Sequence, residues 1–195
     1  MKKIKIFNFG LPRTGTTSFH LYMKNNAFNS VHTNHGFINK CFPKDYFDFL
    51  NDENLQNNSI SLHINKYQVF SDLPWYSFKL RKKIIDKYKN DPNVYFIYTT
   101  RNKQTWIKSI KKIIPYIKSK SEKEFHKMEY NGILSNKHND ADINISLDKF
   151  YDTFHAELKA NENIYELSLD DIDSLKSTLH NLFDTDINMT YPKVN

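Results

Sequence analysis

The sequence predicts an α/β fold of three layers built around a central parallel sheet. Two observations lead to this prediction. Short apolar segments alternate along the chain with longer amphipathic ones, which is the order typical of parallel strands joined by helical crossovers. The segment 93–100, Asn-Val-Tyr-Phe-Ile-Tyr-Thr-Thr, holds β-branched and aromatic residues and no charge, as expected of a strand that is covered on both faces.

Short apolar runs of strand length predict the strands of this sheet. They lie at residues 4–9, 29–32, 67–71, 93–100 and 164–167. The segments between them have helical spacing. Pro74 suits the first turn of a helix, and Pro92 ends that helix. Helices are expected at residues 15–25, 45–50, 75–88, 104–114, 121–131, 147–161 and 171–183.

The composition predicts one domain over residues 1–195, because 39% of the residues are hydrophobic and no linker or repeat divides the chain. Cys41 is the only cysteine, which excludes an intrachain disulfide and a cysteine metal cluster. The apolar run at residues 4–9 is too short for a signal peptide or a membrane anchor. We therefore expect a soluble, cytoplasmic protein without a metal site.

The net charge of +6 fits an anionic partner. However, the lysines are scattered through an Asn- and Ile-rich sequence, and the Tyr and Phe residues fall mostly on apolar strand and helix positions. A protein that binds nucleic acid would instead place aromatic side chains between exposed basic ones. The net charge by itself therefore says little about the partner, and we expect neither nucleic acid nor a membrane as partner.

The segment after the first predicted strand has the spacing of a phosphate-binding loop, G-x-x-x-x-G. Residues 10–18 read Gly-Leu-Pro-Arg-Thr-Gly-Thr-Thr-Ser. Backbone amides at a helix N-terminus, with hydroxyls beside them, bind anions. A plain strand-to-helix turn is the alternative interpretation. The candidate phosphate-binding residues are Arg13, Thr14, Gly15, Thr16, Thr17 and Ser18.

Thr16 stands where a P-loop has the Lys that reaches the β- and γ-phosphates. The cation of this loop comes earlier, at Arg13, which disfavours an ATP-dependent kinase. The loop resembles the 5′-phosphosulfate-binding loop, P-K-S-G-T-T, of sulfotransferases that use 3′-phosphoadenosine-5′-phosphosulfate (PAPS). This resemblance implies a P-loop NTPase-like fold, with Arg13 on the phosphosulfate and residues 14–18 on the 5′-phosphate.

A second motif agrees with the first. Arg101 follows the strand at 93–100, and Ser109 comes eight residues later. The pair is similar to the 3′-phosphate motif of the same family, and a guanidinium can grip a phosphate through two hydrogen bonds. Taken alone, Arg101 could equally form a surface ion pair. The family resemblance runs from residue 4 to the end of the sequence, where residues 191–195 resemble an F-P-x-x-N ending.

Candidate bases follow the second and third predicted strands. Asp72 occupies the place where many sulfotransferases carry a His in a T-H-L-P element, and burial would have to raise its pKa for this role. Asp72 could also cap the helix that follows. His32 and His35 are the alternative bases. The candidate catalytic residues are Arg13, Asp72 and His35.

The resemblance implies transfer of a sulfuryl group from PAPS to a hydroxyl or amine of a small-molecule or glycan acceptor, with PAP (3′,5′-adenosine bisphosphate) as product. The alternatives are a P-loop-type nucleotide or small-molecule kinase and a cofactor-binding protein without turnover. One element of cytosolic sulfotransferases, R-K-G-x-x-G, is absent, since no glycine follows Gly132. Either Lys103, Lys108 or Lys193 supplies the positive charge of the absent element, or this protein binds the cofactor more weakly than those enzymes do.

Overall fold

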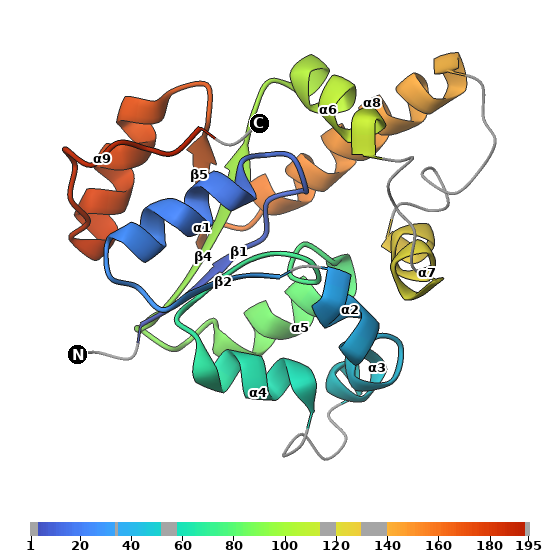
Figure 1. Ribbon diagram of the computed structural model, residues 1–195, viewed down its shortest axis with the longest axis horizontal. Coiled ribbons are helices and arrows are strands. Elements are labelled where there is room, and N and C mark those ends of the chain that lie inside the picture. The colour runs from blue at the N-terminus through green and yellow to red at the C-terminus, as the bar shows by residue number, and fades with distance from the viewer. Residues whose placement is uncertain (1–3, 34, 52–57, 114–119, 130–139, 194–195) are drawn as a thin grey trace.

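The computed structural model describes residues 4–33, 35–51, 58–113, 120–129 and 140–193. A sheet of five parallel strands forms the middle layer, in the order β2-β3-β1-β4-β5 (Figure 1). The predicted α/β fold with a central parallel sheet is confirmed. The strands are β1 (Lys5–Asn8), β2 (Ser30–Thr33), β3 (Val69–Asp72), β4 (Val94–Thr100) and β5 (Ile164–Ser168).

The register of the sheet brings the ends of several strands together. Asn8, the last residue of β1, is paired with Ser71 of β3 on one side and with Ile97 of β4 on the other. Because the strands are parallel, the segments that follow β1, β3 and β4 all leave from the same edge. Ligands of open parallel sheets bind at this carboxyl edge.

One face of the sheet is covered by α1 (Thr16–Asn25) and α9 (Ile172–Phe183) (Figure 1). Alternate strand residues point to this side, as the period-two geometry of a strand requires. They form one core cluster with apolar side chains of the two helices, and the cluster includes Ile6, Val69, Ile97, Leu167, Phe19, Tyr22, Met23, Leu175, Leu179 and Phe183.

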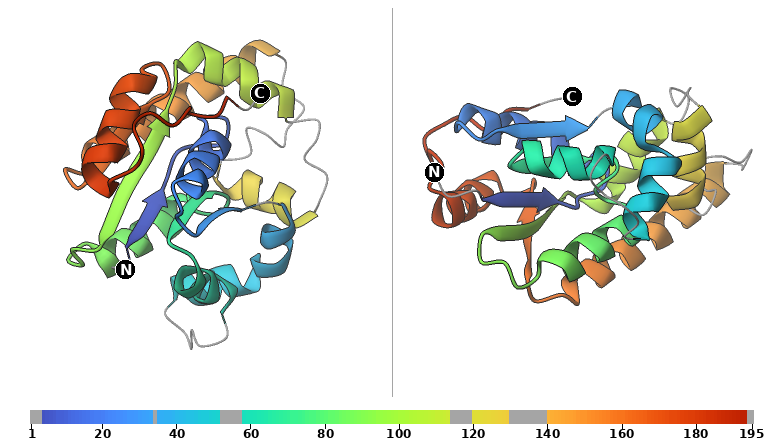
Figure 2. Two further views of the ribbon diagram at one scale, coloured as in Figure 1. Left: turned by 60° about the vertical axis from the view of Figure 1, so that its left-hand side comes forward. Right: turned by 90° about the horizontal axis from the view of Figure 1, so that it is seen from below.

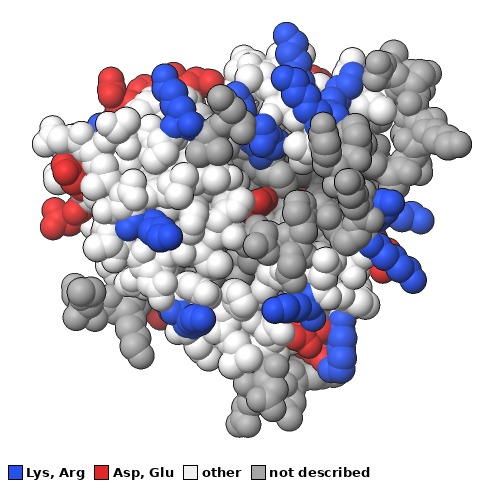
Figure 3. Space-filling view, in the orientation of Figure 1, with Lys and Arg blue, Asp and Glu red and all other residues white. Residues whose placement is uncertain are grey.

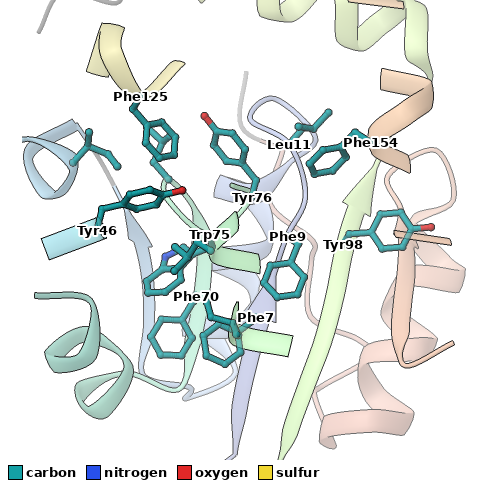
Figure 4. Close-up of a cluster of buried hydrophobic side chains, with 14 of the residues drawn as sticks. Phe7, Phe9, Leu11, Tyr46, Phe70, Trp75, Tyr76, Tyr98, Phe125 and Phe154 are labelled. Atoms are coloured by element: carbon teal, nitrogen blue, oxygen red, sulfur yellow. The ribbon is translucent and has the colours of Figure 1, made fainter. Parts of the chain in front are cut away.

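The other face carries a larger, aromatic core. It is covered by α5 (Phe78–Tyr88), α6 (Lys103–Ile113) and α8 (Asp140–Lys159). Figure 4 shows the rings of this cluster packed against one another, with Phe7 and Phe70 stacked at a centroid distance of 4.7 Å. The cluster gathers strand, loop and helix residues, among them Phe7, Phe9, Leu11, Phe70, Trp75, Tyr76, Phe96, Tyr98, Trp106 and Phe154.

The described residues form four further helices. They are α2 (His35–Cys41), α3 (Lys44–Leu50), α4 (Ser59–Lys66) and α7 (Lys120–Glu129). In the right-hand view of Figure 2, β1 and β2 point the same way, and α2 and α7 lie beyond their carboxyl ends. No described helix combines the length and the apolar character that crossing a bilayer would require.

Two predicted helix starts are wrong. The third predicted helix begins at Phe78 instead of residue 75, because Ser77 is its N-cap and accepts a hydrogen bond from the amide of Leu80 at 3.3 Å. Trp75 and Tyr76 precede it in a turn and are buried in the core. The helix expected from residue 147 begins at Asp140. Asp72 therefore does not cap α5, which corrects the alternative role considered for it.

Candidate active site

The loop between β1 and α1 is braced by β4. The side-chain oxygen of Asn8 accepts hydrogen bonds from the amide of Gly10 at 2.9 Å and from the amide of Thr99 at 3.2 Å. The hydroxyl of Thr14 donates to the carbonyl of Leu11 at 2.6 Å and lies 3.1 Å from the hydroxyl of Thr99. These buried contacts hold the loop in one conformation against the central strand.

Both glycines of the loop are required by its geometry. A Cβ atom on Gly10 would lie 2.2 Å from the hydroxyl oxygen of Thr99, which is too close for any side chain. Gly15 has a φ of 81° in the left-handed region, and a Cβ there would lie 2.2 Å from Cδ1 of Leu169. Helix α1 begins directly after Gly15, so its first amides, which have no intrahelical partner, face the loop.

The two motifs, far apart in the sequence, meet at Arg13. Nε of Arg13 donates a hydrogen bond to the hydroxyl of Ser109 at 2.8 Å. Nη1 of Arg101 donates to the carbonyl oxygen of Arg13 at 3.1 Å. The indole of Trp106 donates to the carbonyl of Pro12 at 2.9 Å. The loop is thus tied directly to the segment after β4 and to α6.

Two arginine side chains give the site positive charge. Arg13 and Arg101 are both half-buried, and within the described part of the chain neither lies within 4.0 Å of a carboxylate. Lys103 differs, because its ammonium lies 2.9 Å from Asp148 and 3.0 Å from Asp152. Two guanidinium groups beside a helix N-terminus make this edge of the sheet suited to a polyanion.

Figure 3 shows that basic side chains also gather around α6, at the top of the face drawn there. Lys108 is exposed on this helix, one residue before Ser109. Of the lysines considered as replacements for the missing C-terminal element, Lys103 is held by its two carboxylates, whereas Lys108 and Lys193 are exposed.

Asp72 ends β3 beside the loop, with a φ of 70°. Its Oδ2 lies 3.2 Å from Nε2 of His32, which also lies 3.3 Å from the hydroxyl of Thr16 and 3.1 Å from that of Thr17. Burial, with a smaller contribution from His20, lowers the pKa of His32 to about 4. Burial thus favours the neutral ring, whose contact with Asp72 is then a hydrogen bond.

The structure thus brings most of the predicted site residues into one region. Arg13, Arg101 and Ser109 form one connected group, and Asp72 joins Thr16 and Thr17 through His32. Ser18 is buried on α1. His35 is the first residue of α2, and its side chain lies outside the described residues, so its role stays a prediction.

Sequence reasoning missed the side chains that support the loop. Asn8 and Thr99 hold its backbone, Trp106 bonds to Pro12, and the hydroxyl of Tyr151 donates to the carbonyl of Arg101 at 2.6 Å. A polar Asn at the end of an otherwise apolar strand was the one signal available for Asn8. Nothing in the local sequence around residue 151 indicates its contact with Arg101.

Comparison with protein families agrees with this geometry. A profile described as a sulfotransferase domain matches residues 5–184. The match covers the loop after β1, Asp72, and the Arg101 and Ser109 pair, so this chain belongs to the sulfotransferase domain family and is a transferase of sulfuryl groups. A search among curated proteins returns no match.

Proposed function

We propose that this protein transfers a sulfuryl group from PAPS to a hydroxyl or amine of a small-molecule or glycan acceptor and releases PAP. The observation that carries the proposal is the hydrogen-bonded group of Arg13, Ser109 and Arg101. It would join the loop proposed for the 5′-phosphate to the residues proposed for the 3′-phosphate, as a ligand with phosphates at both positions requires. Residues 1–195 would form a single catalytic domain.

The residues present fit this donor. Amides of the loop and of the start of α1, together with Arg13, Thr14, Gly15 and the hydroxyls of residues 16–18, would hold the 5′-phosphosulfate. Arg101 and Ser109 would hold the 3′-phosphate. When bound, PAPS supplies an electrophilic sulfur and a phosphate leaving group. The two half-buried guanidinium groups supply the charge that such an anion needs.

Arg13 and the loop amides would act mainly on the leaving phosphate. Sulfuryl transfer, like phosphoryl transfer, builds negative charge on the leaving oxygen, so fixed donors aimed at that oxygen lower the barrier. The loop that carries these donors is held rigidly by Asn8 and Thr99, so little reorganisation accompanies the reaction. Among the described residues, no three His, Cys, Asp or Glu side chains gather as a metal site would need.

Asp72 would take the proton from the acceptor. Its position at the carboxyl end of β3, joined through His32 to Thr16 and Thr17, places a carboxylate next to the loop. A general base must lie within hydrogen-bonding reach of the group that it deprotonates. His35, at the start of α2, stays the alternative base.

Calorimetric titration with PAP, beside ATP with Mg²⁺, tests the proposal on the wild type and on Arg101→Ala. Micromolar PAP binding, about 8 kcal/mol, is expected for the wild type. Arg101→Ala should weaken it at least about tenfold, since a charge-assisted phosphate contact is lost. Lys89→Ala, which removes an exposed cation at the C-cap of α5, is the control and should have a smaller effect. Tighter binding of ATP with Mg²⁺, unchanged by Arg101→Ala, would favour the kinase alternative and overturn the proposal.

A further inference from the structure

One imidazole nitrogen is shared by the phosphate loop and by Asp72. Nε2 of His32 lies 3.1 Å and 3.3 Å from the hydroxyls of Thr17 and Thr16, and 3.2 Å from Oδ2 of Asp72. The side chains of His32 and Asp72 are 21% and 17% exposed, so water competes little for these contacts. A ring nitrogen has one hydrogen-bonding position, which either donates or accepts. Three oxygen atoms from two parts of the site therefore compete for one position.

The two neutral tautomers of His32 serve different partners. With its hydrogen on Nε2, the ring can donate to the carboxylate of Asp72, which is a charge-assisted bond. With the hydrogen on Nδ1, Nε2 can accept from Thr16 or Thr17, but its lone pair then faces a carboxylate oxygen. The hydroxyls of Thr16 and Thr17 thus favour one tautomer, and Asp72 favours the other.

An anion in the loop removes this competition. The hydroxyls of Thr16 and Thr17 then have a charged acceptor, which binds their hydrogens more strongly than a neutral ring nitrogen does. Asp72 remains as the partner of Nε2, and only the tautomer with hydrogen on Nε2 can serve it. Binding in the loop and orientation of the carboxylate are thereby linked through one side chain.

We propose that His32 is a positioning residue, which couples anion binding in the loop to the orientation of the Asp72 carboxylate. The bound anion selects the tautomer of His32 that carries its hydrogen on Nε2. That hydrogen bonds one oxygen of Asp72 and leaves the carboxylate oriented to receive the proton of the acceptor. The inference rests on the proposed function, since it takes Asp72 as the base and the 5′-phosphosulfate as the anion.

The neighbouring His20 provides a matched control. Its ring centroid lies 5.8 Å from that of His32, and its Nδ1 lies 2.8 Å from the hydroxyl of Ser30. Its hydrogen bond is thus to a residue outside the loop, although its ring lies close to that of His32. A variant His20→Gln removes an imidazole close to His32 without removing the contacts to Thr16, Thr17 or Asp72.

Nitrogen NMR of protein labelled with ¹⁵N-histidine tests the coupling, with PAP as the titrant. The resonances of His32 are those missing from the spectrum of His32→Gln. PAP should shift the Nε2 resonance of the wild type toward that of a protonated ring nitrogen, and Nδ1 toward that of an unprotonated one. The shift should persist in His20→Gln and be lost in Asp72→Ala, where no carboxylate selects the tautomer.

The outcomes separate this inference from the proposed function. If calorimetry detects PAP binding while both His32 resonances stay unchanged, the coupling is overturned and the proposed function stands. A shift that persists in Asp72→Ala also overturns the coupling, because the anion would then act without the carboxylate. If PAP does not bind the wild type, the proposed function fails and this inference fails with it.

Discussion

Two candidate site residues have left-handed backbone conformations. Among the described residues, four that are not glycine have a positive φ, and two of them, Arg13 and Asp72, are candidate site residues. Such conformations cost roughly 1–2 kcal/mol for a residue with a Cβ atom. They persist where surrounding contacts fix the backbone, as the bonds of Arg101 and Trp106 to the loop do here.

Gly15 and Ala27 form a matched pair for testing backbone strain. Gly15→Ala should lower the free energy of unfolding by about 2 kcal/mol or more, because the residue has a φ of 81° and its Cβ would clash with Leu169. Ala27→Gly should raise it slightly, since Ala27 already has a φ of 64°. Urea unfolding measures both. An unchanged midpoint for Gly15→Ala would show that the loop adopts another conformation in solution.

At the scale of single elements, N-cap side chains determine where helices α5 and α6 begin. Ser77 starts α5 by accepting from the amide of Leu80, and its hydroxyl also bonds to the buried hydroxyl of Tyr46. Asn102 does the same for α6, where its side chain accepts from the amide of Thr105 at 3.1 Å. Because α6 carries Ser109, the cap also sets the position of that side chain relative to Arg13.

Ser77→Ala should cost about 1–2 kcal/mol of stability, because it removes the N-cap of α5 and the bond to Tyr46. Tyr46→Phe removes the hydroxyl that bonds to Ser77 and leaves the cap in place, so the loss on adding Ser77→Ala to Tyr46→Phe gives the contribution of the cap. Thermal or urea unfolding of both variants and of the double variant checks this. No further loss on adding Ser77→Ala to Tyr46→Phe would contradict a capping role for Ser77.

At the scale of the whole molecule, buried histidines link stability to pH, and His155 is one that lies outside the candidate site. His155 of α8 is 7% exposed and packs against Tyr151 and Tyr98, with ring centroids 4.0 Å and 5.6 Å away. Burial lowers its pKa to about 4. The unfolded chain, in which this group titrates near its ordinary pKa of 6.5, therefore binds a proton that the folded chain does not.

Stability should consequently fall as the pH drops from about 6.5 to about 4, by on the order of 3 kcal/mol from His155 alone. His155→Phe removes the titrating group and should make the free energy of unfolding less dependent on pH within that window. Denaturant unfolding across the window measures this. His180→Gln, which changes an exposed histidine, is the control. A pH dependence identical in wild type and His155→Phe would contradict the assignment.

Most of the fold could be predicted from the sequence. The strand at 93–100 and the helix starting near residue 15 are correct to within one residue, because their apolar periodicity is strong and glycine or charged residues bound them. The start of α5 was wrong, since Pro74 is as compatible with a turn as with a helix. Trp75 and Tyr76 are buried in the aromatic core. These contacts with residues distant in the sequence favour a turn over a helix at this position.

The sequence by itself determined the order of strands and helices along the chain, the G-x-x-x-x-G spacing of the loop after β1, and the resemblance that led to the sulfotransferase family. These depend on local spacing and residue type, which the linear chain displays directly. Only the tertiary structure decided that Arg13 bonds Ser109, that Arg101 bonds the loop, and that His32 lies between Thr17 and Asp72. Those contacts join residues on separate strands and helices, and they exist only once the parallel sheet has brought the carboxyl ends of β1, β2, β3 and β4 to one edge.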